Sequence, residues 1–533
     1  MNRNTYLIIV SSLLLLGGLL RFWQLGSLPK TLNPDEAANA YNGYLLAKTG
    51  MDEWGRRWPL ALQSFGDYKL IGYPALLSSL FTFLPLSDWA VRLPAALAGS
   101  TLPLFVLWWL RRLGYGKQTQ LIGCMFMVLT PVFIFYSRVA FEALLGLLLF
   151  LCSISLLFAR TKYRFLFDTL ATIFALLAAL TYNTPLLLIP TLVVLLPLQR
   201  GFLQIKKWIL PVVLLSIVFL LLFSKLSALT GQKSAITIFR DEYHREQSTL
   251  FLSDAPAFLR VFSHPYAYYL NVMGVALVKS FTPNFLIFRG GTHPWHALPQ
   301  HAHLTIPLYM LAICGVIIST LTSIKKILRT PWQSFVRNGL QDTSEMHTVL
   351  IYLLAVGVLP AIVTVDAPHA TRSLLFFFFL VVNAAIGYDY AFHLIRTSFS
   401  KNLLARSASP IFLLTICLAT FLYLYDYFFI FPLRQPIQLP VGFDQAIMQV
   451  SENNPEEPIA VVDPDGTWYI LTSWYLQISA KEYFDTIIRQ DANSFGFRYG
   501  ERVGRFHFIS RASDPRDETI LLNRLDSGWV ISK

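Results

Sequence analysis

Long apolar segments separated by short polar ones dominate the first 431 residues of the chain. A helix needs about 20 apolar residues to cross a bilayer. The apolar segments lack the strict alternation of β-barrel strands, so we expect helices. A hydropathy window of about 19 residues predicts about 11 transmembrane helices. They lie at residues 5–25, 90–110, 118–137, 141–159, 165–182, 185–199, 208–225, 303–323, 348–365, 372–392 and 408–431.

Two long polar segments interrupt this pattern, at residues 26–89 and 226–302. In the first, residues 35–48 have the apolar spacing and the start signals of an amphipathic helix. Residues 74–84 form a second apolar piece that is too short to span a bilayer. Both pieces are predicted to lie along the membrane surface. In the second segment, residues 266–281 are apolar and aromatic and are predicted to behave likewise.

The pattern changes after residue 431, where three prolines form a linker. Strands are predicted at residues 459–463, 505–509 and 529–531, with helical stretches between them. Such an arrangement indicates a small α/β domain. The fold class is therefore an all-α polytopic membrane domain, residues 1–431, followed by a small extracytoplasmic α/β domain, residues 432–533.

Composition and charge support a membrane protein. Only 14% of the residues are charged, against about 25% in soluble domains. The net charge of +12 does not indicate a nucleic-acid partner, because the positive residues gather in alternate loops of the predicted bundle. Since cytoplasmic loops carry the excess of Lys and Arg, we expect a cytoplasmic N-terminus and an extracytoplasmic C-terminal domain. The external segments contain no Asn-x-Ser/Thr sequon, which favours a bacterial plasma membrane.

Acids and cations are predicted to meet on the outer side of the bundle. Ionisable groups at the membrane edge are costly and are therefore candidates for function. A carboxylate there can activate a hydroxyl group as a general base, and Lys or Arg can bind a phosphate leaving group. The alternatives are a helix cap for Asp35, and for Lys69, Arg138 and Arg372 contacts with lipid headgroups. The histidines near residue 301 are either loop residues or metal ligands.

Six stretches, in this order, carry a family resemblance. They read NPDEAANAYNGYLLAKTG from residue 33, GDYKLIGYPAL from 66, DWAVRLPAALAGS from 88, FYSRVAFEALLGLLLF from 135, FTPNFLIFRGG from 281 and DAPHATRSL from 366. The set resembles membrane glycosyltransferases of the protein O-mannosyltransferase and aminoarabinose-transferase type, which have the GT-C fold. The resemblance covers roughly residues 1–430.

The resemblance implies roles for particular residues. Asp35 matches the family's essential acid and has Glu36 beside it. The remaining matches concern the donor phosphate and are Lys69, Arg138, His369 and Arg372. Asp67 matches an acid that binds a divalent metal in some members, but Tyr68 separates it from Lys69. A metal is thus an open alternative, with Asp67 and His301 as the candidate ligands.

The function that follows is inverting transfer of a hexosyl or pentosyl group on the outer face of the membrane. The donor would be a sugar on a polyprenyl-phosphate carrier, and the acceptor a lipid, a glycan or a protein. Two other classes stay open at this point: a transporter or flippase of lipid-linked saccharides, and a non-enzymatic protein of envelope assembly. A transporter of this kind is expected to have internal repeats and charges within the spans. The sequence shows no internal repeat, and the interior of its spans is almost uncharged.

Overall fold

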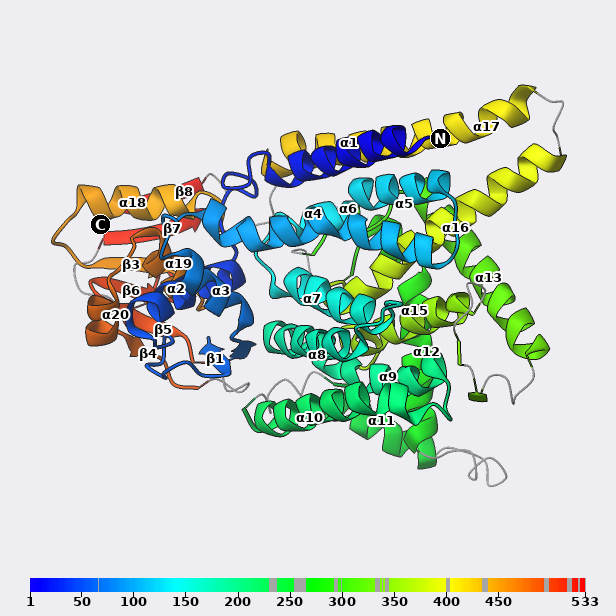
Figure 1. The fold of residues 1–533 in the computed structure, drawn as a ribbon. Helices are drawn as coiled ribbons and strands as arrows, with labels where there is room; N and C mark the ends of the chain where they lie inside the picture. The colour runs from blue at the N-terminus through cyan, green and yellow to red at the C-terminus, as the bar shows by residue number, and fades with distance from the viewer. Residues whose placement is uncertain are drawn as a thin grey trace.

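The computed structural model is mostly helical and carries a sheet in its C-terminal part (Figure 1). It describes residues 1–65, 67–229, 237–253, 265–291, 296–298, 300–330, 336–337, 339–340, 345–398, 403–433, 440–492, 498–514, 520–525 and 528–532.

Every predicted span coincides with a helix of the bundle. These helices are α1 (Arg3–Phe22), α4 (Asp88–Arg112), α5 (Lys117–Leu129), α6 (Pro131–Tyr136), α7 (Glu142–Leu157), α8 (Arg164–Thr181), α9 (Asn183–Arg200), α10 (Ile205–Leu229), α13 (Ile306–Arg329), α15 (Met346–Ile362), α16 (Leu374–Ser398) and α17 (Leu403–Tyr425). The prediction of a polytopic helical protein with a C-terminal α/β part is confirmed.

The number of spans is a separate matter. Within the described residues, 8 helices are long and apolar enough to cross a membrane, and α7 and α15 are shorter apolar helices. The predicted helix at residues 118–137 is two helices, α5 and α6. The break lies at Thr130, which is extended with φ −73° and ψ 121°, because Pro131 disfavours the helical conformation in the residue before it. The predicted count is therefore not confirmed.

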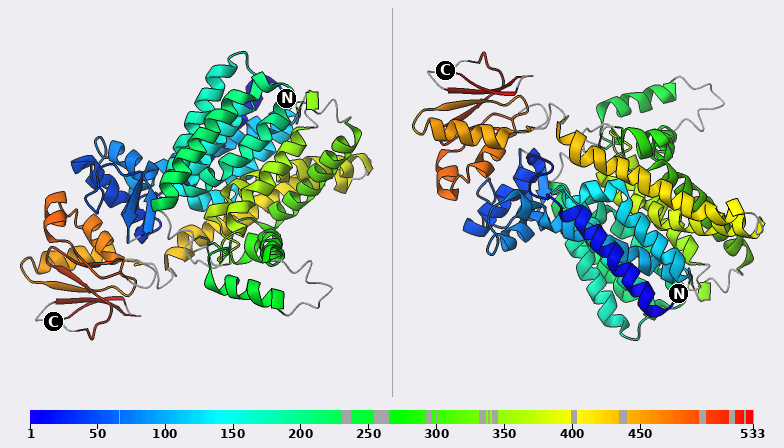
Figure 2. Two further views of the ribbon diagram at one scale, coloured as in Figure 1. Left: turned by 90° about the horizontal axis from the view of Figure 1, so that it is seen from below. Right: turned by 90° about the horizontal axis from the view of Figure 1, so that it is seen from above.

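The backbones of α13 and α16 are in close contact, and α16 is buried along most of its length. A Cβ atom on Gly315 would lie 1.7 Å from the carbonyl oxygen of Asn383, and one on Gly387 would lie 2.1 Å from that of Leu311. Only glycine fits at both positions, as is typical of tightly packed membrane helices. Figure 2 shows the two helices side by side within the bundle.

The segment between α1 and α4 folds as a compact unit with its own helices and hairpin. It contains α2 (Pro34–Thr49), α3 (Gly72–Leu80) and the antiparallel strands β1 (Ala61–Ser64) and β2 (Asp67–Leu70). Helix α2 is not the exposed amphipathic helix that the sequence predicted. Most of its residues are buried, because it packs against α3 and against α19 (Trp468–Tyr475) of the C-terminal domain.

The C-terminal domain is built on a six-stranded sheet with strand order β4-β5-β6-β3-β7-β8. The central strand β3 (Ile459–Val462) runs parallel to β6 (Phe506–Ile509) and to β7 (Ile520–Leu525). Strands β3, β6 and β8 (Gly528–Ser532) match the three predicted strands, whereas β4, β5 and β7 were not predicted. The other elements are α18 (Phe443–Asn453), α20 (Ala480–Thr486), β4 (Ile488–Arg489) and β5 (Gly500–Val503).

The shorter elements connect the bundle helices. They are α11 (Glu242–Ser253), α12 (Pro265–Phe281), the π-helix η2 (Asn284–Phe288), the 3-10 turns η3 (Thr371–Ser373) and η5 (Phe431–Leu433), and the π-helix η4 (Asp426–Ile430). Helix α12 matches the predicted apolar stretch at residues 266–281.

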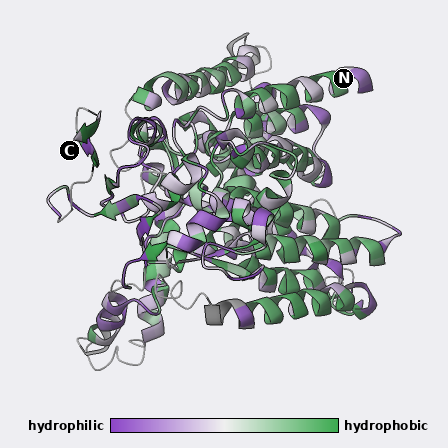
Figure 3. Cartoon of the chain, turned by 90° about the vertical axis from the view of Figure 1, so that its left-hand side faces the viewer, coloured by the Kyte–Doolittle hydropathy of each residue, from purple (hydrophilic) through white to green (hydrophobic). Residues whose placement is uncertain are grey.

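A polar layer covers one end of the bundle. We call it the cap and define it as residues 26–87 together with the C-terminal domain, residues 440–532. The chain's N-terminus lies at the opposite end of the bundle from the cap (Figures 1 and 2). Hydrophobic residues dominate the bundle helices, and hydrophilic residues are more frequent in the cap (Figure 3).

Candidate functional site

An ion pair between α2 and the neighbouring hairpin forms the core of the site. The ammonium of Lys69, on β2, lies 2.5 Å from Oδ1 of Asp35. Asp35 belongs to the first turn of α2, where the helix dipole stabilises a negative charge. Its side chain is 43% exposed, whereas that of Lys69 is only 10% exposed. The accessible member of the pair is therefore the carboxylate.

Local sequence explains why α2 begins where it does. The side chain of Asn33 accepts a hydrogen bond from the backbone of Glu36, and the Glu36 side chain accepts one from the backbone of Asn33. This reciprocal arrangement is a capping box, and Pro34 occupies the first helical position, where it is well tolerated. Asp35 is consequently held in the first turn of α2, and its side chain takes no part in the capping box.

A second acid, Glu142, joins this pair from the start of α7. Its carboxyl lies close enough to Lys69 and Asp35 to interact with both charges, and the side chain of Asn39 hydrogen-bonds to it. Glu142 begins a predicted span, and an acid at the membrane edge is a candidate for function. No specific role was predicted for it from the sequence.

The connection between α15 and α16 supplies the cations of the site's other side. The guanidinium of Arg372 lies 2.5 Å from Oδ1 of Asp366 and donates to the hydroxyl of Thr364 at 2.9 Å. His369 lies 3.5 Å from the same carboxylate through Nε2, and its Nδ1 is 2.9 Å from the hydroxyl of Thr371. One acid thus orients both basic side chains.

Tyr182, between α8 and α9, joins the two halves of the site. It lies near Thr371 and is close enough to Arg372 and Glu142 for electrostatic interaction with both. The structure therefore brings together residues from α2, β2, α7 and the α15–α16 connection. We define the candidate site as Asp35, Lys69, Glu142, Tyr182, His369 and Arg372.

A small apolar cavity of about 10 Å³ adjoins Tyr182 of this site. Tyr182 and Thr371 line one part of it, and the other lining residues come from α7, α9 and α16. They are Ala143, Leu147, Phe150, Thr184, Pro185, Leu188, Leu374 and Leu375. The charged cluster thus adjoins a hydrocarbon-lined surface of the bundle.

Glu36 has a different environment from that of its neighbour Asp35. It is buried, and its Oε1 accepts hydrogen bonds from Nε of Arg92 at 2.9 Å and from the backbone N–H of Ala140 at 2.8 Å. Its Oε2 accepts two bonds from Asn33. With both oxygens occupied, this geometry does not support the predicted catalytic role of Glu36; it supports a role in holding α2 to α4 and to the residues before α7.

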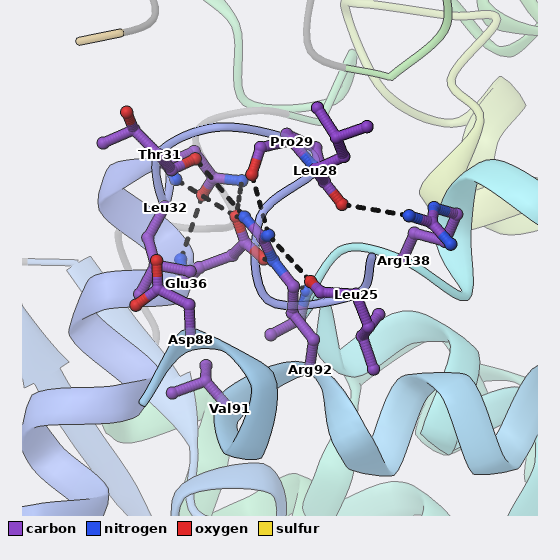
Figure 4. A network of polar contacts seen from close by, with 12 residues as sticks. Leu25, Leu28, Pro29, Thr31, Leu32, Glu36, Asp88, Val91, Arg92 and Arg138 are labelled. Carbon is purple, nitrogen blue, oxygen red and sulfur yellow. Dashed lines mark hydrogen bonds and ion pairs between the residues drawn. The ribbon is translucent and has the colours of Figure 1, made fainter. Parts of the chain in front are cut away.

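Arg92, on α4, was missed by the sequence analysis. Besides its pair with Glu36, its guanidinium donates to the carbonyl oxygens of Leu25, Pro29 and Thr31 (Figure 4). The side chain is fully buried. A charged residue inside a predicted span needs an internal partner, so its position in the sequence contained a usable signal.

Arg138 is also fully buried, and it lies where α1 ends. Its side-chain nitrogens donate to the hydroxyl of Tyr427 and to carbonyl oxygens of the α1 end and the following loop. These acceptors are Leu20, Arg21, Gln24 and Leu28. Figure 4 shows the bond to Leu28. Each guanidinium N–H thus already has an acceptor, and the predicted phosphate contact would have to displace several of them. The phosphate contact of Arg138 stays a prediction, and the contacts observed are those of a clamp for α1.

The metal site at Asp67 and His301 stays a prediction, because only His301 has a described side chain. His301 lies 3.9 Å from Asp426 through Nε2 and packs against Tyr423. The side chain of Asp67 lies outside the described residues. Among the residues that are described, no three His, Cys, Asp or Glu side chains are grouped as metal ligands.

Comparisons with known proteins give a structural likeness only. No protein-family model and no curated protein matches the chain. The Archaeoglobus fulgidus oligosaccharyltransferase in its apo form matches with a TM-score of 0.52 at 12% identity over 89% of this chain. The same enzyme tethered to an acceptor peptide matches with a TM-score of 0.54 at 11% identity. ArnT from Cupriavidus metallidurans bound to undecaprenyl phosphate gives a TM-score of 0.46 at 12% identity over 89% of this chain and 85% of that one.

The chain spans about 64% of the length of the archaeal enzyme. At this level of identity the match establishes the arrangement of helices rather than the activity. The helical bundle and the polar cap agree with this match. The chain has the GT-C fold of membrane glycosyltransferases.

Proposed function

We propose that the protein is a membrane glycosyltransferase that takes a sugar from a polyprenyl-phosphate carrier. The observation that carries this proposal is a charged cluster beside an apolar surface. Asp35 and Lys69 pair at 2.5 Å, and Tyr182 and Thr371, which is next to Arg372, line a small apolar cavity. A lipid-linked sugar phosphate matches these features, because it has a hydrocarbon tail for the apolar surface, and a phosphate and a polar sugar for the charged residues. The archaeal oligosaccharyltransferase has itself been solved with a dolichol-phosphate and an inhibitory peptide.

The basic side chains of the site suit a phosphate. Arg372 and Lys69 present N–H donors, and charge-assisted bonds to phosphate oxygens are among the stronger hydrogen bonds in proteins. Arg372 is partly exposed, with 19% of its side chain accessible, in contrast to the buried Arg138. His369 lies beside it and shares Asp366. In this proposal these three residues hold the donor phosphate, and the tail lies along the apolar surface of the bundle beside Tyr182.

The reaction is a single displacement at the anomeric carbon. Asp35 accepts the proton of the acceptor hydroxyl as the acceptor oxygen bonds to that carbon. The bond between the anomeric carbon and the phosphate oxygen breaks, and its electron pair leaves with the polyprenyl phosphate, whose charge Lys69 and Arg372 stabilise. One displacement inverts the anomeric configuration.

The pairing of Asp35 with Lys69 couples the two steps. An adjacent ammonium stabilises the ionised carboxylate and makes it a weaker base. A donor phosphate competes for the same ammonium. Donor binding would thereby release Asp35 for the acceptor hydroxyl, so the donor is expected to bind before the acceptor.

No step of this mechanism is assigned to a metal. The carboxylates of Asp35 and Glu142 are hard oxygen ligands of the kind that Mg²⁺ prefers, so a divalent ion remains part of the proposal. Lys69 and Arg372 already supply the positive charge that a departing phosphate monoester needs.

The remaining assignments follow the sequence analysis. We propose that the cap faces the outside of a plasma membrane, that a hexosyl or pentosyl group is transferred, and that the acceptor is a lipid, a glycan or a protein. The side opposite the cap carries the basic loops, which supports this orientation.

Reconstitution in liposomes tests the proposal. Purified protein is mixed with undecaprenyl-phosphate sugars labelled in a hexose or a pentose, and with total envelope lipid as acceptor. We expect free undecaprenyl phosphate and a new labelled glycoside. Movement of the donor between leaflets without a new glycosidic bond would instead indicate a transporter. If neither a new glycoside nor movement of the donor is seen, and partner proteins bind to the cap, the protein is an assembly protein.

A further inference from the structure

Phe65 lies beneath the ammonium of Lys69. It occupies the turn between β1 and β2, where its φ of 57° is unusual for a residue other than glycine. Its side chain is buried, and the centre of its ring is 5.6 Å from Nζ of Lys69. A cation at this distance over an aromatic ring is attracted by the ring's electrons. Phe65 is thus in direct contact with the cation of the Asp35 pair.

The C-terminal domain holds Phe65 in this position. The ring of Tyr469, on α19, packs edge-on against Phe65 with centroids 5.9 Å apart and planes at 84°. In addition, the backbone N–H of Arg498 donates to the carbonyl oxygen of Phe65 at 3.1 Å. Both contacts come from a part of the chain more than 400 residues away in sequence.

Tyr469 is itself fixed by a buried acid from the other half of the cap. Its hydroxyl donates to Oε2 of Glu53 at 3.0 Å, and Tyr483 donates to the same oxygen at 3.3 Å. Arg489 lies 3.8 Å from that oxygen and donates to the Glu53 backbone carbonyl at 2.8 Å. Burial raises the pKa of Glu53, and Arg489 opposes that shift. Two charged groups and two tyrosines therefore fasten the domain to the residues that follow α2.

We infer that Phe65 is a positioning residue and that the C-terminal domain completes the candidate site through it. The contacts form one sequence from Glu53 to Tyr469, Phe65, Lys69 and finally Asp35. Lys has a long flexible stem, so its ammonium needs support to stay against one carboxylate oxygen. The structural part of this inference stands alone, while its effect on catalysis rests on the proposed function.

Chemical labelling of Lys69 tests the inference without any assay of transfer. The full-length protein in detergent is treated with an amine acetylating reagent, and the rate of Lys69 modification is followed by mass spectrometry. In Phe65→Leu the ring is lost but an apolar side chain remains, and we expect Lys69 to be modified several-fold faster. Phe65→Tyr keeps the ring and should restore the slow rate.

Matched variants separate this effect from a general loosening of the cap. Phe81→Leu removes a different aromatic contact between the segment and the domain, that with Trp474 at 5.8 Å, and should leave Lys69 labelling unchanged. Tyr469→Leu acts from the domain side and should accelerate labelling as Phe65→Leu does. Equal labelling rates in wild type, Phe65→Leu and Tyr469→Leu would overturn the inference.

Activity gives the second measurement. If the wild type transfers sugar, Phe65→Leu should lower kcat/KM for the donor on the order of tenfold, with the loss mainly in donor KM, and Phe65→Tyr should recover it. If the wild type shows no transfer but Lys69 labelling changes as expected, the proposed function fails and the inference about Phe65 stands.

Discussion

The ammonium of Lys69 lies 2.5 Å from the carboxylate of Asp35, so the most accessible acid of the site is paired with a cation from the neighbouring hairpin. In the proposed reaction both partners change their contacts, because the donor phosphate takes the cation and the acceptor hydroxyl takes the acid. The pair thus sets the order of events.

Replacing Lys69 by Met should weaken donor binding. A hydrogen bond to a charged group contributes about 1.5–3 kcal/mol, so the donor KM is expected to rise by roughly ten- to hundredfold. Steady-state kinetics with a labelled donor measure this change. Lys48→Met, at an exposed position near the end of α2, is the matched control and should leave the donor KM unaltered.

Replacing Arg92 by Met should destabilise the protein rather than alter chemistry. The change leaves Glu36 buried without its cation, and removal of one partner of a buried ion pair costs about 3–5 kcal/mol. Thermal unfolding in detergent should show a marked drop in Tm. Lys48→Met, at an exposed position near the end of α2, is the control and should leave Tm nearly unchanged. Equal shifts for the two variants would argue against this account of Arg92.

Arg138 and Arg372 should respond differently to the same substitution. Arg372→Met should raise the donor KM with little loss of stability, because Arg372 is partly exposed and belongs to the site. Arg138→Met should lower Tm, because the carbonyl oxygens at the end of α1 lose their donors. The donor KM of the folded Arg138 variant should stay near the wild-type value. A donor KM raised to the same extent in both variants would support Arg138 as a phosphate ligand.

Asp463 should make the C-terminal domain less stable as pH rises. Burial raises the pKa of Asp463 to about 7, although backbone amides of Gly466 and Trp468 that donate to it act in the opposite direction. Between about pH 4 and that value, the unfolded chain has lost the proton that the folded domain keeps. The free energy of unfolding therefore decreases as pH increases through this window. Below the window, ionisation of Asp463 does not change it.

The Asp463→Asn variant cannot titrate and isolates the effect. Between about pH 4 and pH 7, its Tm should depend less on pH than that of the wild type. In this window the unfolding free energy of the wild type should fall more steeply, by up to about 1.4 kcal/mol per pH unit. Tryptophan fluorescence follows unfolding, since Trp468 bonds directly to Asp463. Parallel Tm profiles of the two proteins would show that the group titrates at its ordinary value.

The sequence predicted the bundle well because each membrane helix has a signal of its own. Hydropathy over about 20 residues locates α1, α4 or α13 without knowledge of their neighbours. The break at Thr130 was missed because α5 and α6 are both apolar and a window of that length joins them. The hairpin of β1 and β2 was missed for the opposite reason, since four-residue strands are too short to show a period.

The candidate site was predictable only in part, because neighbouring residues of one type differ in tertiary contacts. Asp35 and Glu36 are adjacent acids, and only the fold shows that Glu36 is enclosed by Arg92 and Ala140 while Asp35 is exposed. Arg138 and Arg372 both lie at predicted membrane edges. Their difference depends on the carbonyl oxygens near each guanidinium, which belong to distant segments.

The activity of Asp35→Asn tests the central claim most directly. Asn keeps the size and polarity of the side chain but cannot accept a proton from the acceptor. Asp485→Asn, at an exposed acid of α20, serves as the control, and donor binding and Tm are measured for both variants. We predict that Asp35→Asn binds donor, stays folded and transfers sugar at least about a hundredfold more slowly than the wild type. Transfer by Asp35→Asn at a rate close to that of the wild type and Asp485→Asn would contradict the account.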